Sequence, residues 1–533
     1  MIAHAPFVIV LALLVAAVIL SILAKRLGMP PAAAYVIGGM ALSFAPQRLP
    51  FEIDPEFIMV LFLPPLLQSS AYFTVWRDFK ANLRPIMMLA IGAVIFTTAV
   101  VGLVAHWLVP AMPLAAGFCL GAIVSPPDAV AAKAVLARLP VPERVVTILE
   151  GESLVNDASG LMLYRVATAA ALTGLFDWSD AAMMFAQLTA GGLAAGAAAG
   201  VFVNFLMARL RDTQLIIITS FLSAWATYLG AEALHASGVL AVVTAGLIMG
   251  WGQHAILDAE SRLEAQAVWR SAVFLMEAAV FILIGLALRK VVEELGGFGP
   301  ALTSALPHAL VVTAAMIAAR FVWVFPATYL PRLLIPAIRA RDPFPPPSIP
   351  VIIGWAGMRG VVSLAAALAL PIGFPERGFV ILTTFVVIAV TVLLQGATLG
   401  PLVTWLKPTA PAVGPNPPLG DHAAREKVYS AALERIEAEV DDDGAHLHPR
   451  LMEEYRRRVF IYRKNHEERE ALVDVRRAHF EMALEAVSTA RDELLRLHRL
   501  GCVHDSTLHA VEAELDLEEA RLRRLSGERS NGH

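Results

Sequence analysis

The chain has 533 residues, of which 57% are apolar and 17% carry a charge, with a formal net charge of -4. Half of the 88 charged residues (42 Lys and Arg plus 46 Asp and Glu) follow residue 410. This uneven distribution excludes an ordinary soluble protein, and the absence of a basic stripe in the apolar part excludes a nucleic-acid-binding one. We therefore predict an all-α polytopic membrane protein with a soluble tail.

A membrane-spanning helix needs about 20 mostly apolar residues, and by this measure the sequence predicts thirteen spans. They are residues 7–23, 31–47, 56–75, 85–107, 114–136, 145–173, 182–207, 214–233, 236–252, 267–288, 302–330, 347–371 and 378–406. The first span has no basic segment before it and is followed by Lys25 and Arg26. We interpret it as a retained helix and not as a cleaved signal peptide.

The basic residues of the short connections predict the orientation, because Lys and Arg concentrate on the cytoplasmic side of a membrane. They follow spans one, three, five, seven and eleven, whereas the connections after spans four, six and eight contain none. We expect a multi-pass protein of the cell inner membrane, with its N-terminus outside and its tail in the cytoplasm.

Span five contains two prolines at membrane depth, within GAIVSPPDAVAAKAVL. Proline removes a backbone donor and disfavours helix at the preceding residue, so the span should break near Ser125 to Pro127. Asp128 would then begin the second half-helix, where a carboxylate neutralises the positive end of the helix dipole. This capping role and a role at an ion site are both open for Asp128.

Span six carries acidic residues in ILEGESLVNDASGLM, residues 148–162. Glu152 and Asn156 are four apart, as are Ser153 and Asp157, so each pair shares one helix face and the two faces adjoin. A carboxylate beside a hydroxyl in a dry site can replace part of the hydration shell of Na⁺, or take a proton because desolvation disfavours its charged form. We predict that Asp157 binds a cation and a proton, with Ser153 as a second Na⁺ ligand and Asn156 beside them. The alternative is a hydrogen-bonded, structural Asp157.

Spans ten to twelve hold further charged residues. Glu277 and Arg320, on spans ten and eleven, could pair with each other or act on an ion pathway. Three glycines surround Arg359 in span twelve, which predicts a second interrupted helix. Because spans five and twelve cross in opposite directions, the pattern is typical of a transporter with inverted repeats. Glu152 and Asp128 are the candidate partners of Arg359. We expect a structural ion pair with Glu152, which leaves Asp157 free to bind and release.

The chain divides into a membrane domain at residues 1–407, a Pro-rich linker at 408–420 and a helical tail at 421–533. In the tail, apolar residues recur three and four apart among Glu and Arg, which predicts a small helical hairpin or bundle. Solvated helices with some self-association are the simplest interpretation of this tail. The two cysteines, Cys119 and Cys502, predict no disulfide framework.

Six segments resemble the monovalent cation:proton antiporter-1 family, which includes animal sodium/proton exchangers and bacterial NhaP-like proteins. The segments are LPPLL (63–67), SPPDAVA (125–131), EGESLVNDASGL (150–161), SGVLAVVTAGLIMG (237–250), FILIGL (281–286) and GMRGVVSLAAALALP (357–371). The resemblance covers roughly residues 10 to 405. It implies a thirteen-helix fold with a dimerisation domain and a core domain, the core containing crossed, interrupted spans five and twelve.

The same resemblance assigns roles to residues. It implies that Asp157 carries the cation and the proton, with Ser153 and Asn156 beside it, and that Glu152 and Arg359 are the family's structural ion pair. Other charged positions that match the family are Asp128, Glu277 and Arg320. In this family the Asn–Asp pair, Asn156 and Asp157, implies electroneutral exchange of one cation for one proton. The resemblance also implies a homodimer, and we expect no cofactor.

Two positions depart from the family pattern. Pro127 stands where the family commonly has Thr, so only its carbonyl could contribute to the ion site. Gln68, Ser69 and Ser70 follow LPPLL, where many members have an acid, so a helper carboxylate is absent. Both departures bear on ion selectivity.

We therefore expect a secondary transporter, not an enzyme, that exchanges Na⁺ or Li⁺ for H⁺ by alternating access. K⁺/H⁺ exchange on the same fold is one alternative, and an ion-binding membrane sensor that signals through the tail is another. An intramembrane aspartyl protease would need two carboxylates sharing a proton, but the Gly-x-Gly-Asp loop seen in that class is missing. No Walker A motif marks an ATP-driven pump.

Overall fold

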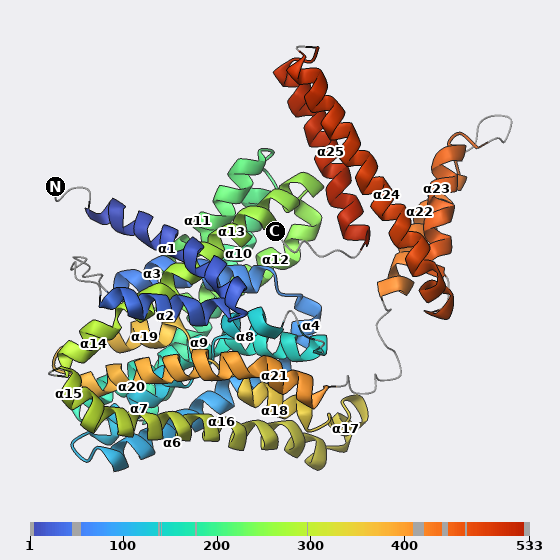
Figure 1. Cartoon of the computed structure of the whole chain (residues 1–533). Coiled ribbons are helices and arrows are strands. Elements are labelled where there is room, and N and C mark those ends of the chain that lie inside the picture. Colours follow the sequence, from blue (N-terminus) through green and yellow to red (C-terminus); the bar gives the residue numbers. More distant parts are fainter. Residues whose placement is uncertain are drawn as a thin grey trace. The chain divides into compact units, whose positions relative to one another are not determined.

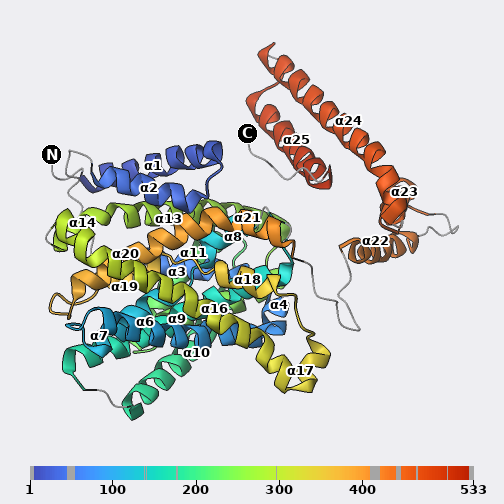
Figure 2. The ribbon, with the colours of Figure 1, turned by 60° about the horizontal axis from the view of Figure 1, so that its bottom comes forward.

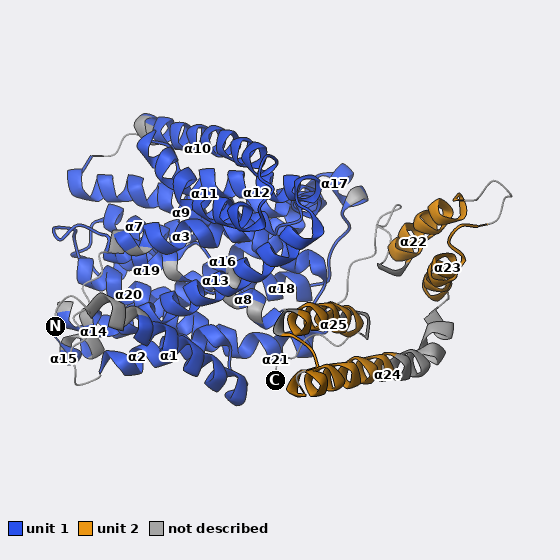
Figure 3. Cartoon of the chain, turned by 90° about the horizontal axis from the view of Figure 1, so that it is seen from above, with its two compact units in different colours: residues 1–412 blue, residues 413–533 orange. Residues whose placement is uncertain are grey.

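The computed structural model describes residues 5–44, 55–136, 139, 141–175, 178–295, 297–408, 421–439, 446–463, 466–500 and 502–526. The chain forms two compact units, Met1–Ala412 and Val413–His533 (Figure 3). All but the first residue of the predicted linker, residues 408–420, lies outside the described residues. The three-part division of the chain therefore stays a prediction.

Helices form the first unit, with no β-strand among its described residues (Figures 1 and 2). Its α-helices are α1 (Ala5–Leu27), α2 (Pro31–Ser43), α3 (Pro55–Tyr72), α4 (Trp76–Ala81), α5 (Leu83–Met87), α6 (Val94–Leu108), α7 (Leu114–Val124), α8 (Ala129–Leu136), α9 (Glu143–Thr173), α10 (Trp178–Met207), α11 (Thr213–Ala233), α12 (Gly238–Ile256), α13 (Ala259–Leu286), α14 (Leu288–Glu294), α15 (Phe298–Pro300), α16 (Leu306–Leu334), α17 (Pro336–Arg341), α18 (Ser348–Trp355), α19 (Val361–Leu368), α20 (Arg377–Val390) and α21 (Gly396–Leu406). Short π-helical segments are η2 (Met88–Ala93), η3 (Ala301–Ala305) and η4 (Thr391–Gln395). Helix is the expected form, because it satisfies every backbone polar group inside an apolar segment.

Within the described ranges, seven helical stretches are long and apolar enough to cross a membrane. They are Leu83–Leu108, Ala182–Met207, Thr213–Ala233, Gly238–Ile256, Ala259–Glu293, Thr303–Leu334 and Arg377–Leu406. Two shorter apolar helices are α2 and α7. The all-helical, multi-pass character is confirmed, while the total of thirteen spans stays a prediction.

Both predicted interruptions are present. In span five, α7 ends at Val124 and α8 begins at Ala129. In span twelve, α18 ends at Trp355 and α19 begins at Val361. The prolines in the first gap lack the backbone N–H that a continuous helix needs as a donor. The glycines in the second gap are conformationally free, which makes a continuous helix less stable there.

The helices of the first unit pack as two groups. In the group that we call the scaffold group, α12 packs on α3, α10 and α11, and α13 packs on α2. In the group that we call the core group, α7 packs on α6 and α9, and α16 packs on α6, α18 and α20. The scaffold group comprises α1–α3 and α10–α13; the core group comprises α5–α9, α16 and α18–α21. Both interrupted spans belong to the core group.

Small residues allow close helix packing in the scaffold group. Gly192, Gly196 and Gly200 lie four apart on one face of α10, and a Cβ at any of them would press on α12 or the residue before it. Apolar helices in lipid gain little from burying further apolar surface, so close backbone approach is what holds them together.

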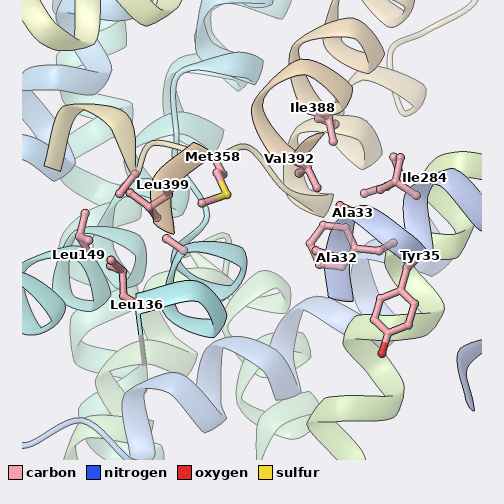
Figure 4. Packing of buried hydrophobic residues seen from close by; sticks show 14 of the residues in the cluster. Ala32, Ala33, Tyr35, Leu136, Leu149, Ile284, Met358, Ile388, Val392 and Leu399 are labelled. Carbon is pink, nitrogen blue, oxygen red and sulfur yellow. The ribbon is translucent and has the colours of Figure 1, made fainter. Parts of the chain in front are cut away.

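One buried apolar cluster holds the interruption of span twelve in place. Figure 4 shows Met358, from the gap between α18 and α19, beside Leu399 of α21. The same cluster contains Ala32 and Ala33 of α2 and Val392 of η4. The gap residues are therefore packed on one side by apolar side chains, which leaves their other side for polar contacts.

The second unit contains α22 (Asp421–Glu437), α23 (Pro449–Arg463), α24 (His466–Arg499) and α25 (Asp505–Ser526). α22 packs on α23, where Tyr429 stacks on Tyr462, and α24 packs on α25, where Arg491 pairs with Asp516 at 2.7 Å. Helix fills most of the described part of the tail. Its cytoplasmic location stays a prediction.

Candidate ion-binding site

The interruption of span five is bonded directly to that of span twelve. The backbone N–H of Asp128 donates to the carbonyl of Met358 at 2.7 Å. Nearby, the Thr98 hydroxyl donates to Ser125 Oγ at 3.2 Å. Two backbone groups that the broken helices leave without a helical partner, the Asp128 N–H and the Met358 carbonyl, thus bond to each other.

Arg359 fills the centre of this arrangement and is completely buried. Its guanidinium donates to the carbonyl oxygens of Val124 and Gly357, the latter at 2.7 Å, and its backbone N–H donates to Thr391 Oγ1 at 3.0 Å. Val124 is the last residue of α7, so the cation lies at the negative end of this half-helix. The freed carbonyls explain how the fold accommodates a buried arginine.

Asp128 occupies the complementary position, at the positive helix ends. It directly precedes α8, and a Cβ added to Gly360, directly before α19, would overlap its Oδ2. The carboxylate therefore lies against the N-terminal ends of two half-helices, both of which carry partial positive charge. Asp128 combines this capping position with a place on the wall of the cavity described next.

A cavity of about 70 Å³ lies between the two helix groups. Its polar lining includes Ser70 of α3, Ser153 and Asp157 of α9, and Ser363 of α19. The volume can hold a small cation together with a few water molecules. We call this cavity the ion cavity.

Asp157 is buried, with 8% of its surface exposed, and faces the ion cavity. It makes no side-chain hydrogen bond or ion pair with any residue that the structure describes. This geometry argues against a hydrogen-bonded structural role, because a buried carboxylate without partners costs stability. It leaves all of the carboxylate lone pairs available to an ion or a proton.

Asn156 forms a hydrogen bond to the interruption of span five. Its Nδ2 donates to the carbonyl of Pro127 at 2.6 Å, and its buried Oδ1 has no hydrogen-bond partner among the described residues. The predicted use of the Pro127 carbonyl as an ion ligand is not supported. That carbonyl is bonded to Asn156, and Pro127 does not line the ion cavity.

The predicted ion pair between Glu152 and Arg359 is wrong. Glu152 pairs with Arg320 of α16 through two hydrogen bonds of 2.6 and 2.9 Å, and both side chains are at least 97% buried. Arg320 also donates to the carbonyl of Ile353, near the end of α18, at 3.1 Å. Two arginines thus bond to equivalent half-helix ends, Arg359 to that of α7 and Arg320 to that of α18. Of the two, Arg320 is the one that forms the ion pair with Glu152.

A pair between Glu277 and Arg320, the other sequence-based possibility, is excluded because Arg320 bonds to Glu152. Glu277 lies on α13, half-buried, and makes no hydrogen bond or ion pair with a described side chain. Its role on an ion pathway stays a prediction.

The three residues that follow LPPLL, where the helper carboxylate is absent, lie in two different environments. Gln68 points to α11, where its Nε2 donates to the carbonyl of Ser220 at 2.7 Å and to Ser223 Oγ at 2.8 Å. Ser69 is also buried, and it donates to the carbonyl of Leu66 within its own helix. Ser70 alone of the three lines the ion cavity.

Sequence reasoning missed two polar residues of this region. Ser363 lines the ion cavity, and Thr391 anchors the backbone of Arg359. Ser363 was detectable, because it is a single hydroxyl in the apolar run VVSLAAALAL, three residues after Gly360. Thr391 carried no such signal, since its role depends on a helix that packs from 32 residues away.

The chain is similar to known membrane proteins. The transmembrane sodium/hydrogen exchanger family matches residues 10–405. An uncharacterized Na⁺/H⁺ exchanger of Mycobacterium tuberculosis is 32% identical over 97% of this chain and 96% of its own length. A sodium, potassium, lithium and rubidium/H⁺ antiporter of Bacillus subtilis is 28% identical over 92% of this chain and 76% of its own length.

Among solved structures, the sodium proton antiporter MjNhaP1 from Methanocaldococcus jannaschii at pH 8 has a similar fold. The TM-score is 0.62 at 19% sequence identity, and the match covers 76% of this chain and 99% of that one. At this identity the likeness concerns the fold alone.

Proposed function

The chain belongs to the sodium/hydrogen exchanger family, and on this basis we propose that it exchanges Na⁺ or Li⁺ for H⁺ at Asp157. One observation carries the proposal: Asp157 is a buried carboxylate without a described partner, on the wall of a cavity at the meeting point of two interrupted helices. Ser153 and Ser363 add hydroxyl oxygens of the kind that hard cations prefer.

The chemistry is a competition between a cation and a proton. A bare carboxylate in a desolvated site is unfavourable, so it is stabilised either by a bound cation or by a proton, but not by both together. If Asp157 is the single carrier, one cation moves in one direction for each proton that moves in the other, and the cycle is electroneutral. The buried Glu152–Arg320 pair keeps its charge constant and holds α9 against α16.

Alternating access requires the ion cavity to face each side of the membrane in turn. The cavity lies between the core and scaffold groups, so a displacement of one group relative to the other would change the side on which it opens. We extend the proposal to thirteen spans with inverted repeats, a homodimer, and an inner-membrane location with the N-terminus outside and the tail in the cytoplasm.

K⁺/H⁺ exchange is a second candidate. It is favoured by the relative from Bacillus subtilis, whose name includes potassium and rubidium as well as sodium and lithium. The absent helper carboxylate near Ser70 also leaves the ion cavity with fewer charged ligands, and weaker ligand fields discriminate less strongly against larger cations.

The test uses purified protein in proteoliposomes with a pH gradient and a fluorescent reporter of pH. Addition of NaCl, LiCl or KCl should dissipate the gradient only for transported cations. Asp157→Asn should abolish exchange, whereas Glu293→Gln, on the exposed face of α14, should leave it unchanged. Full exchange by Asp157→Asn would rule out the proposed site.

The stoichiometry is tested in the same vesicles by adding thiocyanate, a permeant anion that collapses the membrane potential. One-for-one exchange predicts equal rates with and without it. A sensor that binds cations without moving them would show cation binding by the purified protein but no proton movement.

A further inference from the structure

Beyond the ion cavity, α9 passes from the core group into contact with the scaffold group. Arg165 lies eight residues past Asp157, about 12 Å along the helix. Its Nη2 donates to both carboxylate oxygens of Glu232 on α11, at 3.1 and 2.9 Å. Glu232 Oε1 also accepts a hydrogen bond from the backbone N–H of Gly238, the first residue of α12, at 3.1 Å. The ion pair therefore links the helix that carries Asp157 to two scaffold helices.

A buried apolar layer lies between Asp157 and this ion pair. Met162 of α9 is 4% exposed and belongs to one cluster with Leu188 of α10, Tyr228 of α11 and Val239 of α12. The hydroxyl of Thr189 approaches Met162 Sδ at 3.6 Å. This layer, which we call the Met162 layer, excludes water from the side of Asp157 that faces Arg165.

The opposite side of the ion cavity is different. Ser70, on the cavity wall, is exposed, and Ser153 is only half-buried. One turn before Ser153, Glu150 pairs with Lys133 at 2.7 Å, and the Lys133 side chain is 58% exposed. In this structure the site is thus closed toward Arg165 and more open toward Lys133.

We propose that the Arg165–Glu232 ion pair and the Met162 layer form a gate that closes the ion cavity at this end of α9. The basic residues of the connections place this end outside. The proposal rests on the proposed exchange function, which requires the cavity to open here in the other half of the cycle. The pair is half-exposed, at 42% and 30%, so it is weak enough to break and re-form in each cycle. Arg165 and Glu232 are positioning residues that set which side is open.

The test measures access to the Met162 layer without measuring transport. Cys119 and Cys502 are replaced by serine in the full chain, and Val239→Cys, normally 3% exposed, serves as the reporter. A membrane-impermeant maleimide is added from outside in the absence of Na⁺. We expect Arg165→Gln and Glu232→Gln to be labelled about fivefold faster than the parent, because loss of the pair raises the share of molecules open at this end.

Glu232→Gln keeps an oxygen that can accept from the Gly238 N–H, so it removes the charge and not the cap. The double variant, with both Arg165→Gln and Glu232→Gln, should be labelled no faster than either single variant, because both substitutions remove the same contact. The reversed pair, Arg165→Glu with Glu232→Arg, should label at the parent rate. The control replaces Arg289 and Glu293, an exposed pair within α14, by glutamine and should leave labelling unchanged.

Unchanged labelling in Arg165→Gln, or faster labelling from the inside only, would overturn the gate. A purely structural pair would lower the melting temperature in these variants without a change in labelling, and this result would overturn it as well. Failure of the proposed function is separable from both results. It would appear as a parent protein that does not exchange cations, whatever the labelling rates.

Discussion

Glu152 and Asp157 lie five residues apart on α9, and both are buried. Glu152 accepts two hydrogen bonds from Arg320, so its charge is compensated in this structure. Asp157 has no described partner and faces the ion cavity, so its compensation must come from an ion or a proton. The surroundings, and not the residue type, separate the paired carboxylate from the one that we propose to carry the exchange.

Removal of Arg320 should be strongly destabilising. Arg320→Ala leaves Glu152 as an unpaired buried carboxylate, which should lower the free energy of unfolding by about 3–5 kcal/mol. Arg289→Ala, from an exposed pair on α14, should cost under about 1 kcal/mol. Thermal unfolding in detergent, followed by tryptophan fluorescence, measures both. A loss for Arg320→Ala no larger than for Arg289→Ala would contradict the importance of the buried pair.

At the scale of elements, the two interrupted spans form a set of opposed half-helix ends. Arg359 and Arg320 bond to carbonyls at or near the ends of α7 and α18, and Asp128 lies at the starts of α8 and α19. Each end carries about half an elementary charge, so every side chain is placed against a dipole of opposite sign. This complementarity explains why three charges are retained at membrane depth.

Gly360 is the residue that lets Asp128 reach the start of α19. Gly360→Ala would place a Cβ on Asp128 Oδ2 and displace the carboxylate, the two half-helices, or both. We expect exchange to fall at least about tenfold, since displacements near 1 Å at a site have effects of this size. Gly400→Ala, in α21 with no atom near the added Cβ, is the matched control and should retain full activity. Equal activity of the two variants in the vesicle assay would show that the close approach is dispensable.

A second group of charges joins elements at one end of the core group. Asp342, directly after α17, accepts from Arg84 of α5 at 2.6 Å, Arg144 of α9 at 2.8 Å and Arg332 of α16 at 2.7 Å. Burial acts to raise the pKa of Asp342, but the hydrogen bonds and charges of Arg144 and Arg332 outweigh it and hold that pKa below its usual value. The carboxylate therefore stabilises the fold while it is ionised.

The lowered pKa of Asp342 predicts a pH-dependent contribution to stability. A carboxylate whose pKa is lower in the folded state stabilises the fold above its unfolded pKa, near 4, and this contribution disappears as the pH falls through the folded value. We expect Asp342→Asn to be about 2 kcal/mol less stable than the parent at pH 7, with the difference shrinking below about pH 4. Melting temperatures of both proteins from pH 8 to 3 measure it. A difference that grows toward low pH would have the wrong sign.

At the scale of the whole molecule, the chain is two units of different chemistry. The first unit holds every residue of the ion cavity and five buried apolar clusters, whereas few of the described side chains of the second unit are buried, and about one residue in three after residue 410 is charged. The sodium/hydrogen exchanger family match ends at residue 405, before the second unit. Exchange should therefore be a property of the first unit.

A chain truncated after Pro408 tests this division. We expect it to fold and to exchange cations at a rate within about threefold of the full chain, because no contact of the ion cavity is removed. The vesicle assay with NaCl, at equal protein content confirmed by size-exclusion chromatography, gives the comparison. A folded but inactive truncated protein would show that the tail takes part in the cycle.

The sequence by itself determined the class of the protein and most of the candidate site. Long apolar runs predict helices in a membrane, and prolines or glycines within those runs predict interruptions. Both can be predicted from the sequence because both effects act within a few residues. The spacing of Ser153 and Asp157 placed them on one face for the same local reason. The family resemblance, carried by contiguous motifs, is confirmed by the family match.

Only the tertiary structure decided which charges are partners. The sequence paired Glu152 with Arg359, whereas the structure pairs it with Arg320, 168 positions away, and bonds Arg359 to the carbonyl of Val124, 235 positions away. The same holds for the Pro127 carbonyl, which Asn156 occupies, and for the ion pair between Arg165 and Glu232. Helix periodicity specifies which side chains share a face, but the approach of distant helices decides which faces meet.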